Sequence, residues 1–148
     1  LGEGPERGWI EGFARGAGIE ASVTLAGWIG HSQMPAALAA MDVALAPYPV
    51  TEDFYFSPLK VFEYLAVGRP IVASRIGQIA EVLKHGETAI LTPPGDAVAI
   101  ADAVLGLMAN PLQLRRLGEA AALEGALHSW SRNARQALAM GQQLRKAA

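Results

Sequence analysis

The chain has 148 residues, of which 51% are hydrophobic and 18% charged, and its formal net charge is −2. This length suits one domain with a real core, and the lack of a basic excess argues against nucleic-acid binding. Cysteine is absent, which excludes disulfides and thiolate metal sites and suits a cytoplasmic protein. The sequence shows no signal-peptide pattern, and its longest apolar stretch, residues 97–109, is too short to span a bilayer.

Hydrophobic periodicity and turn residues predict helices and strands that alternate along the chain. In chain order we expect helix 5–17, strand 22–29, helix 33–41, strand 43–46, helix 57–67, strand 71–74, helix 79–84, strand 88–92, and helices 97–108, 112–127 and 131–145. The strands are short and almost wholly apolar, as expected when helices cover both faces of a parallel sheet. The order predicts an α/β fold with a doubly wound parallel sheet.

The most informative pattern lies at residues 56–70. Ser57 and Pro58 form a helix-start signature, because a serine oxygen can cap backbone N–H groups and proline fits the first turn. Lys60 falls in that turn, where the positive end of the helix dipole disfavours a cation unless an anion binds there. Helix N-termini bind phosphate readily, so the pattern favours a phosphate site over an ordinary capped helix start.

Glu63 lies one turn after Lys60, on the same helix face. Its neighbours Phe62, Tyr64 and Leu65 predict a largely buried helix, in which a carboxylate needs a partner. A phosphate at the helix mouth with a carboxylate one turn below it suits a nucleotide, whose ribose hydroxyls would reach the carboxylate. The alternatives are a solvated glutamate or the partner of a nearby arginine.

This segment resembles the donor-binding segment of retaining nucleotide-sugar glycosyltransferases with the GT-B fold, specifically the family-4-like (group 1) enzymes. Further similar motifs follow in the family's order, at residues 1–5, 23–28, 41–47, 70–74, 76–77, 81–82, 92–96 and 129–130. Each motif is weak alone, but their order and spacing together are specific. The resemblance implies a metal-independent enzyme that moves a hexose-type sugar from a nucleoside diphosphate sugar to an acceptor hydroxyl.

The resemblance also implies a domain organisation. In the family, two strands precede the turn that residues 1–5 resemble, so we expect residues 1–148 to form one nucleotide-sugar-binding domain, the Rossmann-like C-terminal half of GT-B, without its first strands or the N-terminal acceptor domain. The isolated chain is then expected to transfer no sugar. The acceptor could be a glycan, a lipid or a small molecule, and peripheral membrane contact through the full-length enzyme stays open.

The resemblance assigns roles within the helix start. Backbone N–H groups near Leu59 and Lys60 would receive the donor diphosphate, with Ser57 and Pro58 shaping the turn. Lys60 would steady the leaving diphosphate as the catalytic cation. Glu63 would hydrogen-bond the ribose hydroxyls. No cofactor beyond the donor substrate is expected.

Four loop positions are further donor-binding candidates by the same resemblance. Trp28 and Ile29 follow a predicted strand and would lie beside the base, although Trp28 could instead cover the edge of the core. Gly77 would shape the pocket after another strand. Gly2 and Gly4 resemble a phosphate-side turn, although a lone Gly-x-Gly is weak and ordinary turn glycines are the alternative.

The chain departs from the family pattern at one acid. The family carries an earlier glutamate that contacts the transferred sugar in many relatives, and Tyr55 occupies that position here. Glu52 or Asp53 could replace it, although loop acids are usually solvated. Two other functions are open: a fragment of a non-hydrolysing nucleotide-sugar epimerase, and a non-catalytic nucleotide-sugar-binding module. No metal-ligand spacing is found among the histidines, which are His31, His85 and His128, and the sequence has no Asp-x-Asp pair, so no catalytic metal is expected.

Overall fold

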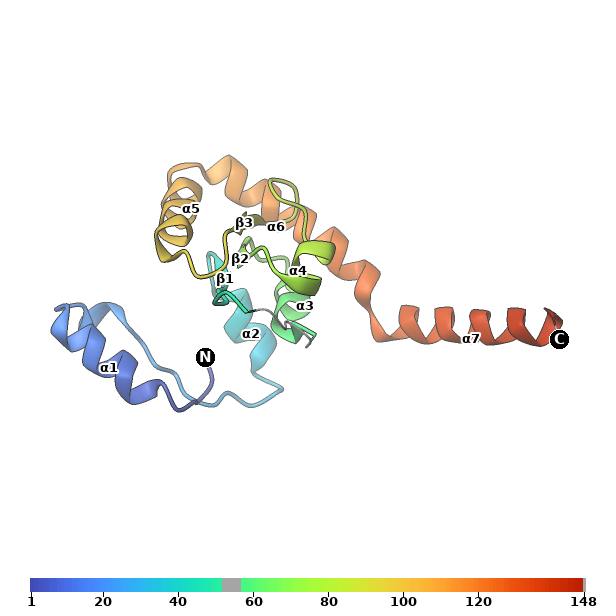
Figure 1. Ribbon diagram of the computed structural model, residues 1–148, viewed down its shortest axis with the longest axis horizontal. Helices are drawn as coiled ribbons and strands as arrows, with labels where there is room; N and C mark the ends of the chain where they lie inside the picture. The colour runs from blue at the N-terminus through green and yellow to red at the C-terminus, as the bar shows by residue number, and fades with distance from the viewer. Residues whose placement is uncertain (52–56, 148) are drawn as a thin grey trace. The chain divides into compact units, whose positions relative to one another are not determined.

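The computed structural model describes residues 1–51 and 57–147, and it divides into two compact units, Leu1–Ala37 and Leu38–Ala148 (Figure 1). The first unit contains helix α1 (Arg7–Gly16), the short 3-10 helix η1 (Glu20–Ser22) and most of helix α2 (Met34–Ala39). Helix α1 carries an exposed ring stack, with the Trp9 and Phe13 centroids 5.5 Å apart.

The strand predicted at residues 22–29 is wrong. After η1, residues 23–30 form an irregular segment, and none of the strand pairings in the described part of the chain involves it. Alternating apolar residues become a strand only when a neighbouring strand takes up their backbone hydrogen bonds. The segment is instead tied by the Gly2 N–H, which donates to the Gly27 carbonyl at 2.7 Å.

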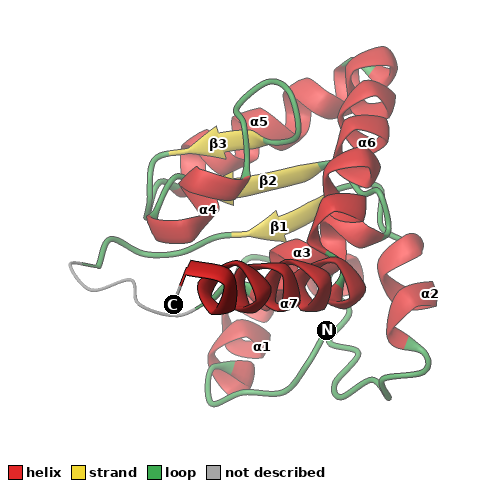
Figure 2. Ribbon diagram, turned by 90° about the vertical axis from the view of Figure 1, so that its right-hand side faces the viewer, coloured by secondary structure: helices red, strands yellow, loops and turns green. Residues whose placement is uncertain are grey.

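The second unit is built on a parallel sheet in the order β1 (Ala44–Ala46), β2 (Ile71–Ser74), β3 (Ile90–Thr92). Figure 2 shows the three arrows side by side and pointing the same way. Ala44 pairs with Ile71 and Val72 pairs with Ile90, so the carboxyl ends of all three strands meet at one edge. The predicted α/β fold with a parallel sheet is confirmed.

Helices connect and flank these strands. They are α3 (Leu59–Ala66), α4 (Gly77–Val82), α5 (Ala97–Ala109), α6 (Pro111–Gly125), the 3-10 helix η2 (Ala126–His128) and α7 (Trp130–Ala147). Two predicted boundaries have visible causes. The Asp96 carboxylate accepts from the Ala99 N–H at 2.9 Å and starts α5, and the Asn110 side chain accepts from the Gln113 N–H at 3.1 Å and starts α6.

Both faces of the sheet are covered. On one face Ile71 and Ala73 of β2 pack with Val61 and Leu65 of α3. On the other face Val72 packs with two buried leucines, Leu107 of α5 and Leu117 of α6. All four β2 residues are buried, which explains why this central strand is continuously apolar.

Helix α3 lies very close to α6 because glycines form the contact. A Cβ atom at Gly125 would lie 2.6 Å from the carbonyl carbon and oxygen of Leu65, and a Cβ at Gly118 would lie 2.9 Å from the Gly68 carbonyl oxygen. Gly68 has φ +63, a conformation that favours glycine, and it ends the turn after α3. The position of α3, which carries Lys60 and Glu63, is therefore fixed by backbone packing on α6.

Candidate functional site

The candidate site is the carboxyl edge of the sheet, where helix α3 begins. In open α/β sheets, ligands bind beyond the carboxyl ends of the strands. Helix α3 follows β1 in the chain, and its first residues are Leu59 and Lys60. The positive end of its dipole and the ammonium of Lys60 therefore occur together at this helix start.

The predicted serine cap is wrong. The N-cap of α3 is Pro58, whose side chain offers no hydrogen-bond acceptor, and its φ of −79° and ψ of 71° form a tight three-residue turn. That turn is closed by the Leu59 N–H, which donates to the Ser57 carbonyl at 2.9 Å, while the Val61 N–H donates to the Pro58 carbonyl at 2.9 Å. Ser57 therefore contributes its backbone carbonyl, and its hydroxyl is left to line a cavity.

Lys60 is exposed, and its Nζ lies 4.9 Å from the centre of the Tyr48 ring. Among the residues described, no carboxylate forms an ion pair with this ammonium. A cation–π contact orients a cation without neutralising it. Lys60 thus keeps its positive charge available at the helix start, as a phosphate site requires.

Glu63 is exposed, so the expectation that burial would oblige its carboxylate to find a partner is wrong. Val61 and Leu65, which are four positions apart, form the buried face of α3, and Glu63 lies between them in sequence and therefore on the opposite side. Glu63 lines a cavity of about 720 Å³ together with Ser57 and Leu59. Its carboxylate is available to a ligand.

Residues outside the predicted set also line this cavity, which we call the α3 cavity, among them Gln78, His128 and Trp130. Gln78 of α4 directly follows the predicted Gly77, His128 is the last residue of η2, and Trp130 is the first residue of α7. The His128 ring lies 5.1 Å from the Phe62 ring, and its Nε2 is 2.9 Å from a Glu124 carboxylate oxygen. Nothing in the local sequence connects residues 128–130 with α3, although 129–130 belong to the motif quoted above.

Tyr64 supports the same edge from α3. Its hydroxyl donates to the Leu45 carbonyl of β1 at 3.3 Å. Burial, then the charge of Glu63 and the neighbouring Tyr48, raise the pKa of the Tyr64 phenol above its ordinary value of 10.0. The phenol therefore remains a hydrogen-bond donor throughout the neutral range.

The other predicted residues are divided between the units. Gly77, with φ +46, begins α4 after β2. Gly2, Gly4, Trp28 and Ile29 all belong to the first unit. Trp28 is 83% exposed and does not cover the core, and its neighbour Ile29 is partly buried. Within that unit the Gly2 turn is bonded to the loop before Trp28 through Gly27.

Tyr55, which occupies the position of the missing family acid, lies outside the described residues, and so do its suggested replacements, Glu52 and Asp53. Within residues 1–51 and 57–147, no three histidine, aspartate or glutamate side chains gather in a way that could hold a metal ion. In the same part of the chain no single helix is long and apolar enough to cross a membrane, and only the pair Ala97–Ala109 and Pro111–His128, bent by 106°, reaches that length and hydropathy together.

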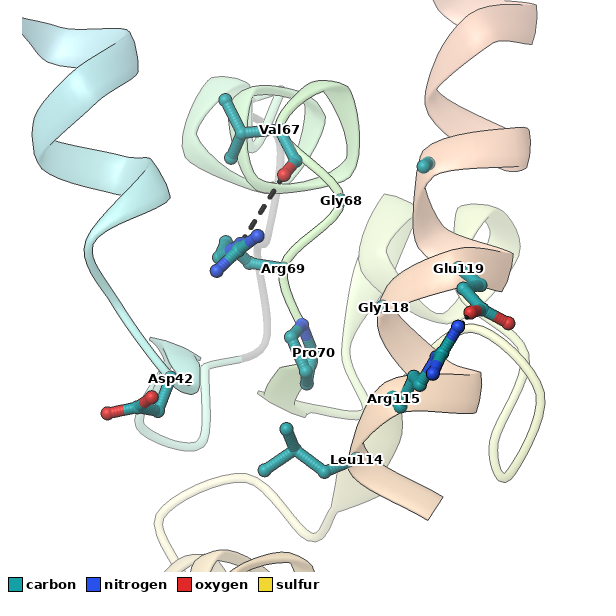
Figure 3. A pocket seen from close by; sticks show the side chains of 10 residues that line it. Asp42, Val67, Gly68, Arg69, Pro70, Leu114, Arg115, Gly118 and Glu119 are labelled. Carbon is teal, nitrogen blue, oxygen red and sulfur yellow. Dashed lines mark hydrogen bonds and ion pairs between the residues drawn. The ribbon is translucent and has the colours of Figure 1, made fainter. Parts of the chain in front are cut away.

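A second cavity, of about 370 Å³, lies beside the turn between α3 and β2 (Figure 3). The two arginines that line it, Arg69 and Arg115, already have protein partners. The Arg69 guanidinium donates to the carbonyls of Ala39 and Met41, both at 3.0 Å, and Arg115 pairs with Glu119 at 2.8 Å. Arg69 thus satisfies the carbonyls at the end of α2, which is a structural role.

Comparison with known proteins identifies the family. Residues 1–110 match the family Glycosyl transferases group 1. An exopolysaccharide phosphotransferase from Streptomyces coelicolor is 35% identical over 82% of this chain and 12% of its own length. A phosphatidyl-myo-inositol mannosyltransferase from Mycobacterium leprae is 30% identical over 80% of this chain and 31% of its own length. The chain thus spans a third or less of these two relatives.

Solved structures agree with this match. Sucrose-phosphate synthase from Thermosynechococcus elongatus has a TM-score of 0.81 and 31% identity over 98% of this chain and 36% of its own. HepE from Anabaena, solved in complex with UDP-glucose, has the same fold, with a TM-score of 0.73 and 20% identity over 93% of this chain and 38% of its own. With residues 1–110 matched, the chain belongs to the group 1 glycosyltransferases and has the Rossmann-like fold of their C-terminal domain.

Proposed function

We propose that this chain is the donor-binding part of a retaining glycosyltransferase. The whole enzyme would move a hexose-type sugar from a nucleoside diphosphate sugar to an acceptor hydroxyl on a glycan, a lipid or a small molecule. One observation carries the proposal. The Lys60 ammonium, which has no ion pair among the described residues, and the exposed Glu63 carboxylate occur one helical turn apart at the start of α3, at the carboxyl edge of a parallel sheet.

The proposed chemistry follows from the charges at this helix start. Breaking the bond between sugar and diphosphate leaves negative charge on the departing phosphate oxygens. The ammonium of Lys60 and the positive end of the α3 dipole would stabilise that charge as it develops. No metal is needed for this role, and the donor substrate is the only small molecule that the proposal requires.

Glu63 would anchor the nucleoside. An exposed carboxylate beside a cavity of about 720 Å³ can accept hydrogen bonds from two ribose hydroxyls. The UDP-glucose bound by HepE, a protein with this fold, supports a uridine nucleotide as the first donor to test. Trp28 and Ile29 are proposed to lie beside the base, and Gly2, Gly4 and Gly77 to shape the loops around the donor. The enzyme is proposed to work in the cytoplasm.

Calorimetric titration of the chain with UDP, GDP and ADP tests the proposal. One nucleotide is expected to bind saturably, and Glu63→Gln is expected to weaken it by about tenfold, because a hydrogen bond to a charged group contributes about 1.5–3 kcal/mol. Lys60→Met should also weaken it. The matched controls, Glu87→Gln and Lys84→Met, remove exposed charges that belong neither to α3 nor to the α3 cavity, and they should bind as the wild type does. Equal losses in the controls would contradict the assignment.

A further inference from the structure

A buried serine holds the residue that lies beneath Lys60. Ser74, the last residue of β2, is 0% exposed. The Tyr48 N–H donates to Ser74 Oγ at 2.8 Å, and the Ser74 hydroxyl donates to the Tyr48 carbonyl at 3.1 Å. One hydroxyl thus holds both backbone groups of a residue 26 positions away.

A third strand end joins the same residue. The Gly95 N–H, in the turn after β3, donates to the Tyr48 carbonyl at 2.9 Å. The backbone that follows β1 is therefore bonded to the ends of β2 and β3 at one point. This arrangement fixes the Tyr48 backbone more firmly than an ordinary loop, because the hydroxyl that satisfies it is itself buried in the sheet.

The Tyr48 ring then sets the place of the Lys60 ammonium. Lysine has a flexible side chain that samples many rotamers when it is exposed. The contact between Lys60 Nζ and the Tyr48 ring, at 4.9 Å, selects among those rotamers. Removing the Ser74 hydroxyl would take away both of its bonds to the Tyr48 backbone and leave the bond from the Gly95 N–H, so the ring would be held less firmly.

We propose that Ser74 is a positioning residue for donor binding, acting through Tyr48 to hold the Lys60 ammonium at the start of α3. The inference rests on the proposed function, in which Lys60 meets the donor diphosphate. It predicts that Ser74 affects the recognition of phosphate and leaves the recognition of the nucleoside unchanged.

NMR titration of the chain with UDP and with uridine tests this separation. Ser74→Ala is expected to weaken UDP binding by about two- to fivefold, the range of an exposed cation–π contact, and to leave uridine binding unchanged. Ser74→Thr keeps the hydroxyl and should restore the affinity for UDP. The matched control is Thr92→Val, which removes a buried hydroxyl at the end of β3 that bonds to the Ala73 carbonyl and should not alter either affinity.

A second variant tests the same connection without touching the sheet. Tyr48→Leu removes the ring and keeps the backbone bonds to Ser74, so it should weaken UDP binding as Ser74→Ala does, while Tyr48→Phe should retain it. In a double-mutant cycle, Ser74→Ala should add little to Tyr48→Leu. It should also add little to Lys60→Met.

The outcomes separate the two proposals. Equal losses of UDP and uridine binding in Ser74→Ala, or additive losses with Tyr48→Leu, would overturn the positioning role while leaving the donor site intact. If the folded wild-type chain bound none of UDP, GDP and ADP, the proposed function would fall, and the role of Ser74 with it.

Discussion

Three glycine-to-alanine substitutions test whether backbone contact between α3 and α6 fixes the position of the candidate site. A Cβ atom added at Gly106, within α5, would meet none of the described atoms within 4 Å. A Cβ at Gly118 would meet one backbone oxygen at 2.9 Å, and a Cβ at Gly125 would meet three backbone atoms of Leu65 and Ala66 at 2.6–2.8 Å. All three glycines are helical. The gain in helix propensity is therefore similar, and the contacts differ.

The magnitudes follow from that difference. Alanine in place of a helical glycine adds roughly 0.5–1 kcal/mol of stability, so Gly106→Ala should raise the free energy of unfolding. At Gly125 the Cβ falls short of ordinary contact, 3.4 Å, by 0.8 Å against backbone. Overpacking of this kind costs about 1–3 kcal/mol, which exceeds the gain. Gly118→Ala should be intermediate.

Urea unfolding followed by circular dichroism measures this order. Thermal unfolding should show the same order. For a chain of this size a change of about 1 kcal/mol in the free energy of unfolding corresponds to roughly 2–4 °C in Tm, so Gly106→Ala and Gly125→Ala should differ clearly. The variants should share one m value, which reports the same surface exposed on unfolding. If Gly125→Ala proved as stable as Gly106→Ala, the close approach of α6 to α3 would be refuted.

Four further predictions concern the site and its supports. The pKa of Tyr64 is raised in the folded state. The stability that this shift contributes is therefore complete below about pH 10, the pKa of an unfolded tyrosine, and is lost as the pH rises through the pKa of the folded state. Tyr64→Phe should flatten this fall in stability above about pH 10. Glu63→Gln removes one cause of the shift and should lower the Tyr64 pKa, measured by absorbance at alkaline pH. Asp96→Ala removes the cap of α5 and should cost about 1 kcal/mol in thermal unfolding. The chain should bind donor without transferring sugar, measured by release of UDP from UDP-glucose.

Each of these predictions has an outcome that contradicts it. An unchanged alkaline transition in Tyr64→Phe would mean that other groups cause it, and an unshifted tyrosine titration in Glu63→Gln would remove the electrostatic link. An Asp96→Ala chain as stable as the wild type would show that the cap contributes nothing. Turnover by the purified chain would overturn the expectation of inactivity.

The parts of the fold that local sequence determines were predicted closely. The strand at residues 71–74 was predicted to the residue, because an apolar run begins directly after Pro70 and every side chain is buried. Asp96, which precedes the predicted helix 97–108, caps α5, whereas the cap that Asn110 provides for α6 was not predicted. The strand at residues 22–29 failed because its formation depends on a pairing partner, which local sequence does not specify.

The candidate site was predicted in part. The helical spacing of Lys60 and Glu63 singled out both residues, whose role in binding stays a prediction, and the environment of Glu63 was misjudged. Its sequence neighbours point in other directions around the helix, so their burial says little about its own. The bonds between Ser74 and Tyr48 join residues 26 positions apart, and no sequence pattern encodes such a contact.

Mapping the nucleotide site on the isotope-labelled chain by NMR would test directly whether a donor nucleotide binds at the start of α3. On addition of UDP, the largest amide shifts are expected at Leu59–Glu63 of α3 and at Tyr48, and these shifts should saturate together. Shifts confined to the second cavity, around Arg69 and Arg115, would show that the nucleotide does not bind at the start of α3.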